Sequence, residues 1–186
     1  MYVSGSMSAK ATFNPSRVTE PAVAALLLRD AGHEVTVICP RMRGCNEPEE
    51  CLEGIRIFRH WISGEARGVR GFIREYASAL WGELTCPRKA WRRGGFDVIH
   101  LCNPPDLLFL VAWPFKLFGV RIIYDVHDLW PEMFHAKFKR RGVMYAAVRA
   151  AERLTYACAD VVLCTNESVR TVALGRGRKK PDCLFV

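Results

Sequence analysis

The 186-residue chain is 50% hydrophobic and 25% charged and carries a formal net charge of +8, which suits one domain with a full core, or one domain plus a tail. The positive charge favours anionic partners such as nucleic acid, anionic lipid headgroups or phosphorylated small molecules. The longest apolar run, "LLFLVAWPFKLF", is broken by Pro114 and Lys116 and falls short of the ~20 residues that cross a bilayer, which argues against a membrane span.

The first half of the chain predicts two helices and two strands. Apolar residues at helical spacing in "RVTEPAVAALLLRDAG" predict a helix that ends at Gly32, and the β-branched run 35–39 predicts a strand covered on both faces. The segment "GIRIFRHW" alternates and predicts a strand nearer an edge, after a loop over 41–54. The second helix is predicted by a stripe of Val69, Ile73, Tyr76, Leu80 and Leu84.

The second half of the chain predicts a regular alternation of strands and helices. Strands are expected at 96–103, 120–126, 160–167 and 183–186, and helices at 104–119, 143–159 and 168–174. Together, the two halves predict an α/β fold with an open, mostly parallel, Rossmann-like sheet and helices on both faces. Residues 1–13 are mostly small and polar and are expected to be irregular, so the Rossmann-like domain is assigned to residues 14–186.

The eight cysteines predict neither a disulfide scaffold nor a zinc site. The sequence has no CxxC pair and no evident Cys/His cluster, and disulfide scaffolds normally belong to smaller secreted chains. The N-terminal residues lack the apolar core of a signal peptide. We therefore expect free thiols, no bound metal, and a cytoplasmic protein that is soluble or bound peripherally at the inner face of a membrane.

Polar side chains follow three successive strands of the predicted sheet. They are Asn103 and Asp106 after the first strand, Asp125, His127, Asp128 and Glu132 after the second, and Thr165, Asn166, Glu167 and Ser168 after the third. Ligands of such sheets bind beyond the carboxyl ends of the strands, so these side chains are expected to converge on one edge.

For several of these residues, a structural role is an alternative to ligand binding. Asn103 is as well suited to cap the following helix as to bind a ligand, while Asp106 suits a helix N-terminus and Ser168 a helix cap. His127 is the strongest functional candidate, because it lies at a strand end between two carboxylates. The sequence has no GxGxxG, no P-loop and no GxSxG motif, which disfavours a dinucleotide dehydrogenase, an NTPase and an α/β-hydrolase.

The motifs "NPPD", "DVHDLWPE" and "TNES" occur in this order within "DVIHLCNPPDLLFLVAWPFKLFGVRIIYDVHDLWPEMF" and "DVVLCTNESVRTVALGRG". With the helix–strand segment 17–40, they resemble the N-terminal half of GT-B glycosyltransferases of family 4, over about residues 14–186. The resemblance implies retaining transfer of a sugar from a nucleotide-sugar to a glycan or lipid-linked acceptor, without a metal or other cofactor. It also implies two Rossmann-like domains, of which the N-terminal one mainly holds the acceptor.

The resemblance assigns residue roles at the strand ends. His127 would lie in the cleft near the transferred sugar, and Asp125 and Asp128 would orient it as the other members of the catalytic set. The implied substrate-binding residues are Arg17, Asn103, Asp106, Glu132, Thr165, Asn166 and Glu167.

The sequence departs from the family pattern in two places. The segment "TFNPSRV" replaces a glycine-rich first loop, and the C-terminal donor-binding domain is absent. We therefore expect the chain to be inactive alone, either as a truncated product or as one subunit of a split enzyme that borrows its other half from a partner.

A basic stretch with tryptophans suggests docking on an anionic membrane. Its residues are Arg67, Arg70, Arg74, Trp81, Arg88, Lys89, Trp91, Arg92 and Arg93. A solvated basic face is an equal alternative. The competing function is a non-catalytic module that binds a partner protein or a polyanion through this face, although no nucleic-acid-binding motif is present, which disfavours nucleic acid. A nucleotide-dependent dehydrogenase or epimerase is a third hypothesis, weakened by the missing glycine motif.

Overall fold

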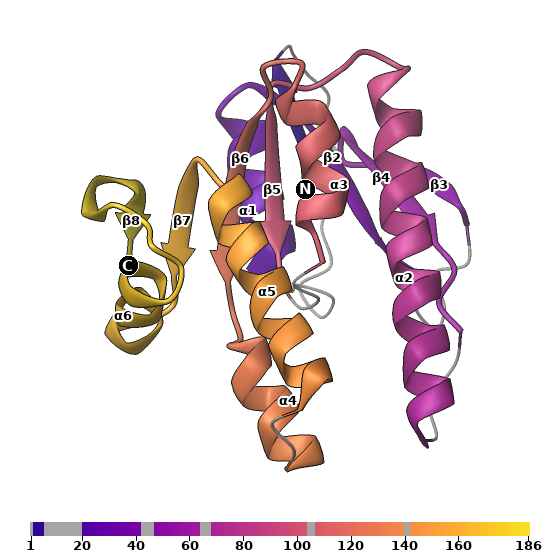
Figure 1. The fold of residues 1–186 in the computed structure, drawn as a ribbon. Helices are drawn as coiled ribbons and strands as arrows, with labels where there is room; N and C mark the ends of the chain where they lie inside the picture. Colours follow the sequence, from indigo (N-terminus) through magenta and orange to yellow (C-terminus); the bar gives the residue numbers. More distant parts are fainter. Residues whose placement is uncertain (1, 6–19, 42–46, 64–67, 104–106, 140–141) are drawn as a thin grey trace. The chain divides into compact units, whose positions relative to one another are not determined.

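A computed structural model describes residues 2–5, 20–41, 47–63, 68–103, 107–139 and 142–186 (Figure 1). The chain forms two compact units, unit 1 over Met1–Val98 and unit 2 over Ile99–Val186, and each is described by itself. Among the described residues, every helix is too short or too polar to cross a bilayer.

Unit 1 is a mixed sheet with two helices. Its elements are β1 (Tyr2–Gly5), α1 (Glu20–Asp30), β2 (His33–Pro40), β3 (Glu49–Leu52), β4 (Ile55–His60) and α2 (Gly68–Trp91). The strands are ordered β3-β4-β2-β1. The central pair, β2 and β4, is parallel, while β1 and β3 pair antiparallel with their neighbours.

The two helices of unit 1 cover opposite faces of its sheet. Ala25 of α1 packs with Val35 and Ile55 in one buried cluster. His60 lies on the other face of β4, because side chains alternate along a strand, and it contacts Gly82 of α2. The alternation predicted for β4 therefore places one helix on each side.

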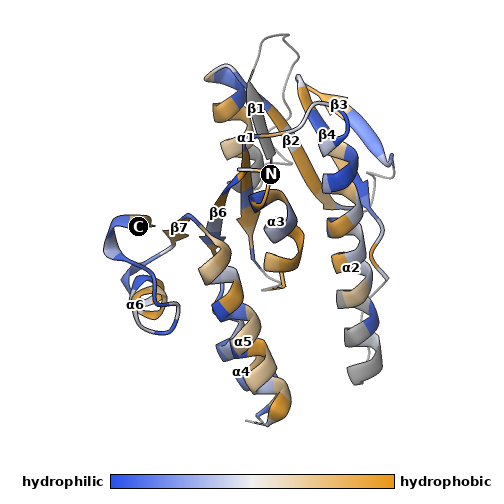
Figure 2. Cartoon of the chain, turned by 45° about the horizontal axis from the view of Figure 1, so that its top comes forward, coloured by the Kyte–Doolittle hydropathy of each residue, from blue (hydrophilic) through white to orange (hydrophobic). Residues whose placement is uncertain are grey.

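Two strands of unit 1 were not predicted. Residues Tyr2–Gly5 form β1 although an irregular segment was expected, because Tyr2 and Val3 favour a strand and the whole segment pairs with β2. The expected loop 41–54 contains β3, which is joined to β4 by Glu53 and Gly54 with φ of 53° and 80°. Positive φ at both positions is the geometry of a two-residue hairpin. The strand β3 is polar (blue in Figure 2) and mostly exposed.

Unit 2 carries a four-stranded parallel sheet in the order β5-β6-β7-β8. Its strands are β5 (Val98–Cys102), β6 (Arg121–Val126), β7 (Val161–Cys164) and β8 (Leu184–Phe185). Its helices are α3 (Phe109–Lys116), α4 (Trp130–Phe138), α5 (Val143–Cys158), α6 (Glu167–Gly175) and the 3₁₀ turn η2 (Pro181–Cys183). The α/β, Rossmann-like class predicted from the sequence is confirmed. Helix α4 was not predicted; it begins one residue before Pro131, which suits a first helical turn.

The two faces of this parallel sheet differ in burial. Residues 99, 101, 122, 124 and 126 are buried, whereas residues 98, 100, 102, 123 and 125 are only half-buried. Tyr124 on the buried face meets Tyr156 of α5 edge to face, with ring centroids 5.2 Å apart. The half-buried face is therefore the one that presents polar side chains with access to solvent.

Candidate active site at the strand ends of unit 2

The side chain of Asn103 holds the loop that follows β6. Asn103 is buried at the end of β5, and its Oδ1 accepts hydrogen bonds from the backbone N–H of His127 (2.8 Å) and Asp128 (3.2 Å). Its Nδ2 donates to the carbonyl of Asp128 (2.6 Å). These three hydrogen bonds of one amide fix the backbone on which His127 stands, so Asn103 has a structural role at the end of β5.

His127 lies at the surface end of β6 beside Asp125. Its Nε2 is 3.3 Å from Asp125 Oδ2, and its side chain is 30% exposed. The ring is thus held by a carboxylate while a ligand can still reach it. This arrangement agrees with the predicted grouping of His127 and Asp125, and Asp128 is exposed on the same loop.

A second histidine, His100 of β5, shares the same carboxylate. His100 Nε2 lies 3.0 Å from Asp125 Oδ2. Burial favours the neutral ring, but the hydrogen bonds to Asp125 and Cys102 outweigh it and raise the pKa of His100 to about 9. Burial likewise opposes ionisation of Asp125, and its bond to His100 and the charge of His127 overcome this and lower the pKa of that carboxyl.

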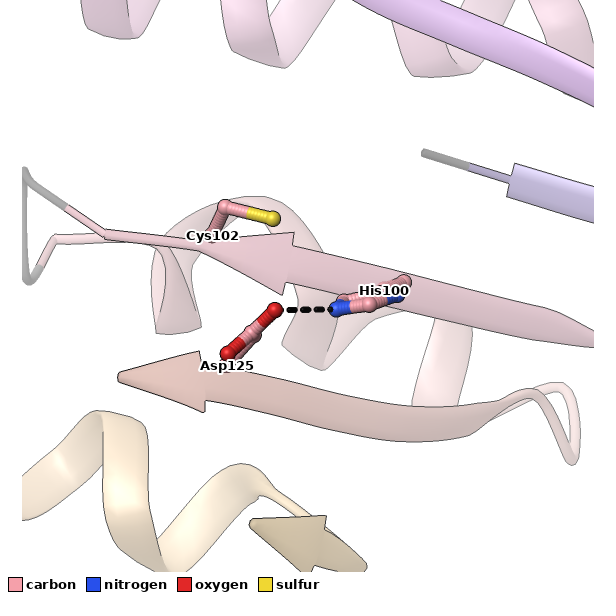
Figure 3. Close-up of side chains that lie close together, drawn as sticks. All are labelled: His100, Cys102 and Asp125. Atoms are coloured by element: carbon pink, nitrogen blue, oxygen red, sulfur yellow. Dashed lines mark hydrogen bonds and ion pairs between the residues drawn. The ribbon is translucent and has the colours of Figure 1, made fainter. Parts of the chain in front are cut away.

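His100 and Cys102 were missed in the sequence analysis as site residues. They stand two positions apart on β5, so they point to the same face of the sheet, and Asp125 joins them from β6 (Figure 3). The expectation that no Cys/His cluster exists is therefore wrong for the folded chain. The alternation of His100 and Cys102 within one strand was the signal available.

The polar residues that follow β7, the third of these strands, make contacts within their own segment. Asn166 caps α6, with its Oδ1 accepting from the N–H of Val169 (3.0 Å), a role expected for Ser168. Thr165 is exposed, and Glu167 pairs with Arg170 on the same helix. Because β5, β6 and β7 are adjacent and parallel, all three strand ends lie along one edge as predicted, but a ligand contact at this third end stays a prediction.

Glu132 belongs to an ion-pair network in unit 2. Arg176 binds both of its carboxylate oxygens, at 2.6 and 2.9 Å, and also contacts the buried carboxylate of Glu152 at 2.6 Å. Burial opposes ionisation of Glu132, but Arg176 lowers the pKa of that carboxyl. A structural role therefore accounts for Glu132. Arg17 and Asp106 lie outside the described residues.

The predicted basic face lies on α2, and part of its charge is compensated. Lys89 and Arg93 both pair with Glu49 of β3, at 3.2 and 2.5 Å. Trp91 packs edge to face on Phe96. The side chains of Arg74, Trp81, Arg88 and Arg92 are exposed, and those of Lys89 and Arg93 are exposed although paired, whereas the side chains of Arg67 and Arg70 lie outside the described part.

Comparisons with known proteins bear on the family to which the chain belongs. The family model described as "Glycosyl transferase 4-like domain" matches residues 19–186, which is most of the chain. A search of curated proteins finds no match.

Proposed function

Because the chain belongs to the glycosyl transferase 4-like domain family, we propose that it is the acceptor-binding half of a retaining, nucleotide-sugar-dependent glycosyltransferase. The observation that carries this proposal is the clamp of Asn103 on the His127 loop, together with the Asp125 carboxylate beside the His127 ring. These contacts present a half-exposed imidazole at the carboxyl edge of a parallel sheet, where ligands of this fold class bind.

The proposed mechanism is electrostatic and needs no metal. His127 would hydrogen-bond a hydroxyl of the donor sugar, and Asp125 would orient the ring, as a fixed partner does for catalytic histidines. A second Rossmann-like domain, supplied by a partner or by further polypeptide, would hold the nucleotide and stabilise the departing diphosphate. On this proposal the 186-residue chain binds acceptor glycans but does not turn over alone.

Ligand-observed NMR with the 186-residue chain tests the binding half of this proposal. Panels of glycans and of nucleotide-sugars are titrated, and saturation transfer to a subset of glycans, but not to nucleotide-sugars, is the expected result. Absence of transfer to every glycan would overturn the acceptor-binding role.

The role of His127 is tested by adding a complementary second domain and measuring sugar transfer. His127→Ala should lower turnover by about 10²-fold, the usual loss for a group that acts on the transition state, with little change in the folded state. His33→Ala is the matched control, because His33 is exposed on β2 of unit 1. Unchanged turnover in His127→Ala refutes the catalytic role and leaves acceptor binding standing.

We also propose peripheral binding at the cytoplasmic face of a membrane through α2, where the lipid-linked acceptor would lie. Trp81 supports this, because its side chain is 70% exposed near exposed arginines. Flotation with anionic vesicles at low salt should capture the chain and lose it in high salt. Equal flotation of Trp81→Ala and the wild-type chain would contradict the use of Trp81.

A further inference from the structure

On the half-buried face of the unit 2 sheet, a nitrogen, a sulfur and an oxygen atom that can each bind a metal lie close together. The atoms are His100 Nε2, Cys102 Sγ and a carboxylate oxygen of Asp125, and all lie within 4.8 Å of one another. Figure 3 shows the three side chains gathered where β5 and β6 run side by side. Neighbouring strands lie about 4.8 Å apart, so donors on one face converge without any loop being required to bring them together.

The chemistry of this donor set is specific. Imidazole and thiolate are ligands that Zn²⁺ and similar transition metals prefer, whereas Ca²⁺ and Mg²⁺ prefer oxygen only. In a tetrahedral zinc site the metal–ligand distances of roughly 2.0–2.3 Å place ligand atoms about 3–4 Å apart. His100 Nε2 and Asp125 Oδ2, at 3.0 Å, are already at the short end of that range.

An ion could reach this cluster from solvent. The side chains of His100 and Asp125 are 13% and 20% exposed, and Cys102 is half-buried. The rigid strands β5 and β6 supply all three donors, so little backbone would have to be ordered on binding. His127 Nε2 lies 3.3 Å from Asp125 Oδ2, which makes it a candidate for a fourth ligand.

We propose that His100, Cys102 and Asp125 form a binding site for a divalent transition metal of the zinc class, with water or His127 as the fourth ligand. Binding displaces two protons to solvent, the thiol proton of Cys102 and the proton on Nε2 of the His100 ring, and engages the carboxylate that otherwise supports His127. The ion is assigned no step in sugar transfer, and the site stands independently of the proposed function.

Titration of the reduced, chelator-treated chain with Co²⁺ tests the site by absorption. The expected result is one Co²⁺ per chain, intense visible bands of tetrahedral cobalt and a near-ultraviolet band from a cobalt–thiolate bond, all removed by Zn²⁺. Cys102→Ser should abolish the thiolate band, and His100→Gln should weaken Co²⁺ binding by at least about tenfold.

Cys51→Ser is the matched control, because Cys51 is an exposed thiol on β3 of unit 1. Its spectrum should equal that of the unmodified chain. A thiolate band that persists in Cys102→Ser, or a spectrum of hexahydrated Co²⁺ in the unmodified chain, overturns the proposal. Circular dichroism of each variant establishes that it is folded, and a Zn²⁺-induced rise in Tm that appears only in the unmodified chain and the control provides a second readout.

Discussion

Two ionisable side chains of unit 1 differ from two of unit 2 in whether a charged partner holds them, although unit 1 also has a paired buried carboxylate, Glu53 with Arg29. In unit 1, burial lowers the pKa of His60 and raises the pKa of Glu83 to about 7, and neither His60 Nε2 nor Glu83 Oε2 has a hydrogen-bond partner in the described part of the chain. In unit 2, Glu152 and Asp125 are instead paired with a cation or a histidine. A buried ionisable group without a hydrogen-bond or charged partner favours its neutral form, whereas a group with an oppositely charged partner stays ionised.

This difference shows where the chain holds charge in the folded state. Paired charges in a partly buried environment cost desolvation free energy, so they persist only where the surrounding residues satisfy them. Unit 2 has such groups on β6 and along α4, α5 and α6, and its strand ends carry the candidate site. In unit 1, the contact of α2 with β4 depends on shape, at Gly82 and His60.

The largest effect is expected from removing the cation of the unit 2 network. Arg176→Ala leaves the Glu152 carboxylate, whose side chain is 2% exposed, without its partner, and should lower the free energy of unfolding by about 3–5 kcal/mol. Arg170→Ala is the control, because its partner Glu167 is 73% exposed, and it should cost less than about 1 kcal/mol. Urea unfolding measures both, and equal losses would contradict the distinction.

The next largest effect is expected at the shape-dependent contact of unit 1. A Cβ at Gly82 would overlap the His60 ring, so Gly82→Ala should destabilise the chain by about 1–3 kcal/mol. At Gly175 a Cβ would meet no atom within 4 Å, and Gly175→Ala should change stability by less than about 1 kcal/mol. Thermal unfolding compares them. If Gly82→Ala is as stable as Gly175→Ala, the close approach of α2 to β4 is wrong.

The smallest effect is expected from neutralising Glu83, a half-buried acid of unit 1, and it depends on pH. The folded state raises the pKa of Glu83 from 4.5 to about 7, so the stability that this carboxyl contributes below pH 4.5 is lost as the pH rises through about 7. Glu83→Gln should therefore be more stable than the wild-type chain at pH 8, by on the order of 1 kcal/mol, and similar to it at pH 4. Urea unfolding at both pH values measures the difference. An identical difference at both pH values would show that Glu83 is not buried as a neutral acid.

The fold could be predicted where a strand or helix is marked by an unbroken run or a regular spacing of apolar residues. The runs of apolar residues in β5, β6 and β7 predict strands of a parallel sheet, because alternate residues of each strand are fully buried. The strands β1 and β3 were missed because each has only four residues and is ordered by antiparallel pairing with a distant or following strand, β2 or β4. The helix α4 was hidden by the polar and aromatic residues that precede it.

The candidate site could be predicted only in part. Asn103, Asp125 and His127 follow strands, so their placement at one edge follows from parallel topology. The partner of each side chain does not follow from topology. The cation that binds Glu132 is Arg176, 44 residues away, and no local pattern connects them. Asn166 rather than Ser168 caps α6 because the helix begins at Glu167.

By itself, the sequence determined the order of the strands of unit 2, its helices α3, α5 and α6, and the polar residues at each strand end, since periodicity and turn residues are local properties of the chain. Only the tertiary structure decided which of those residues meet. The half-buried face on which His100 and Cys102 join Asp125 exists because β5 and β6 lie side by side, and the charge that each buried group carries depends on neighbours distant in sequence.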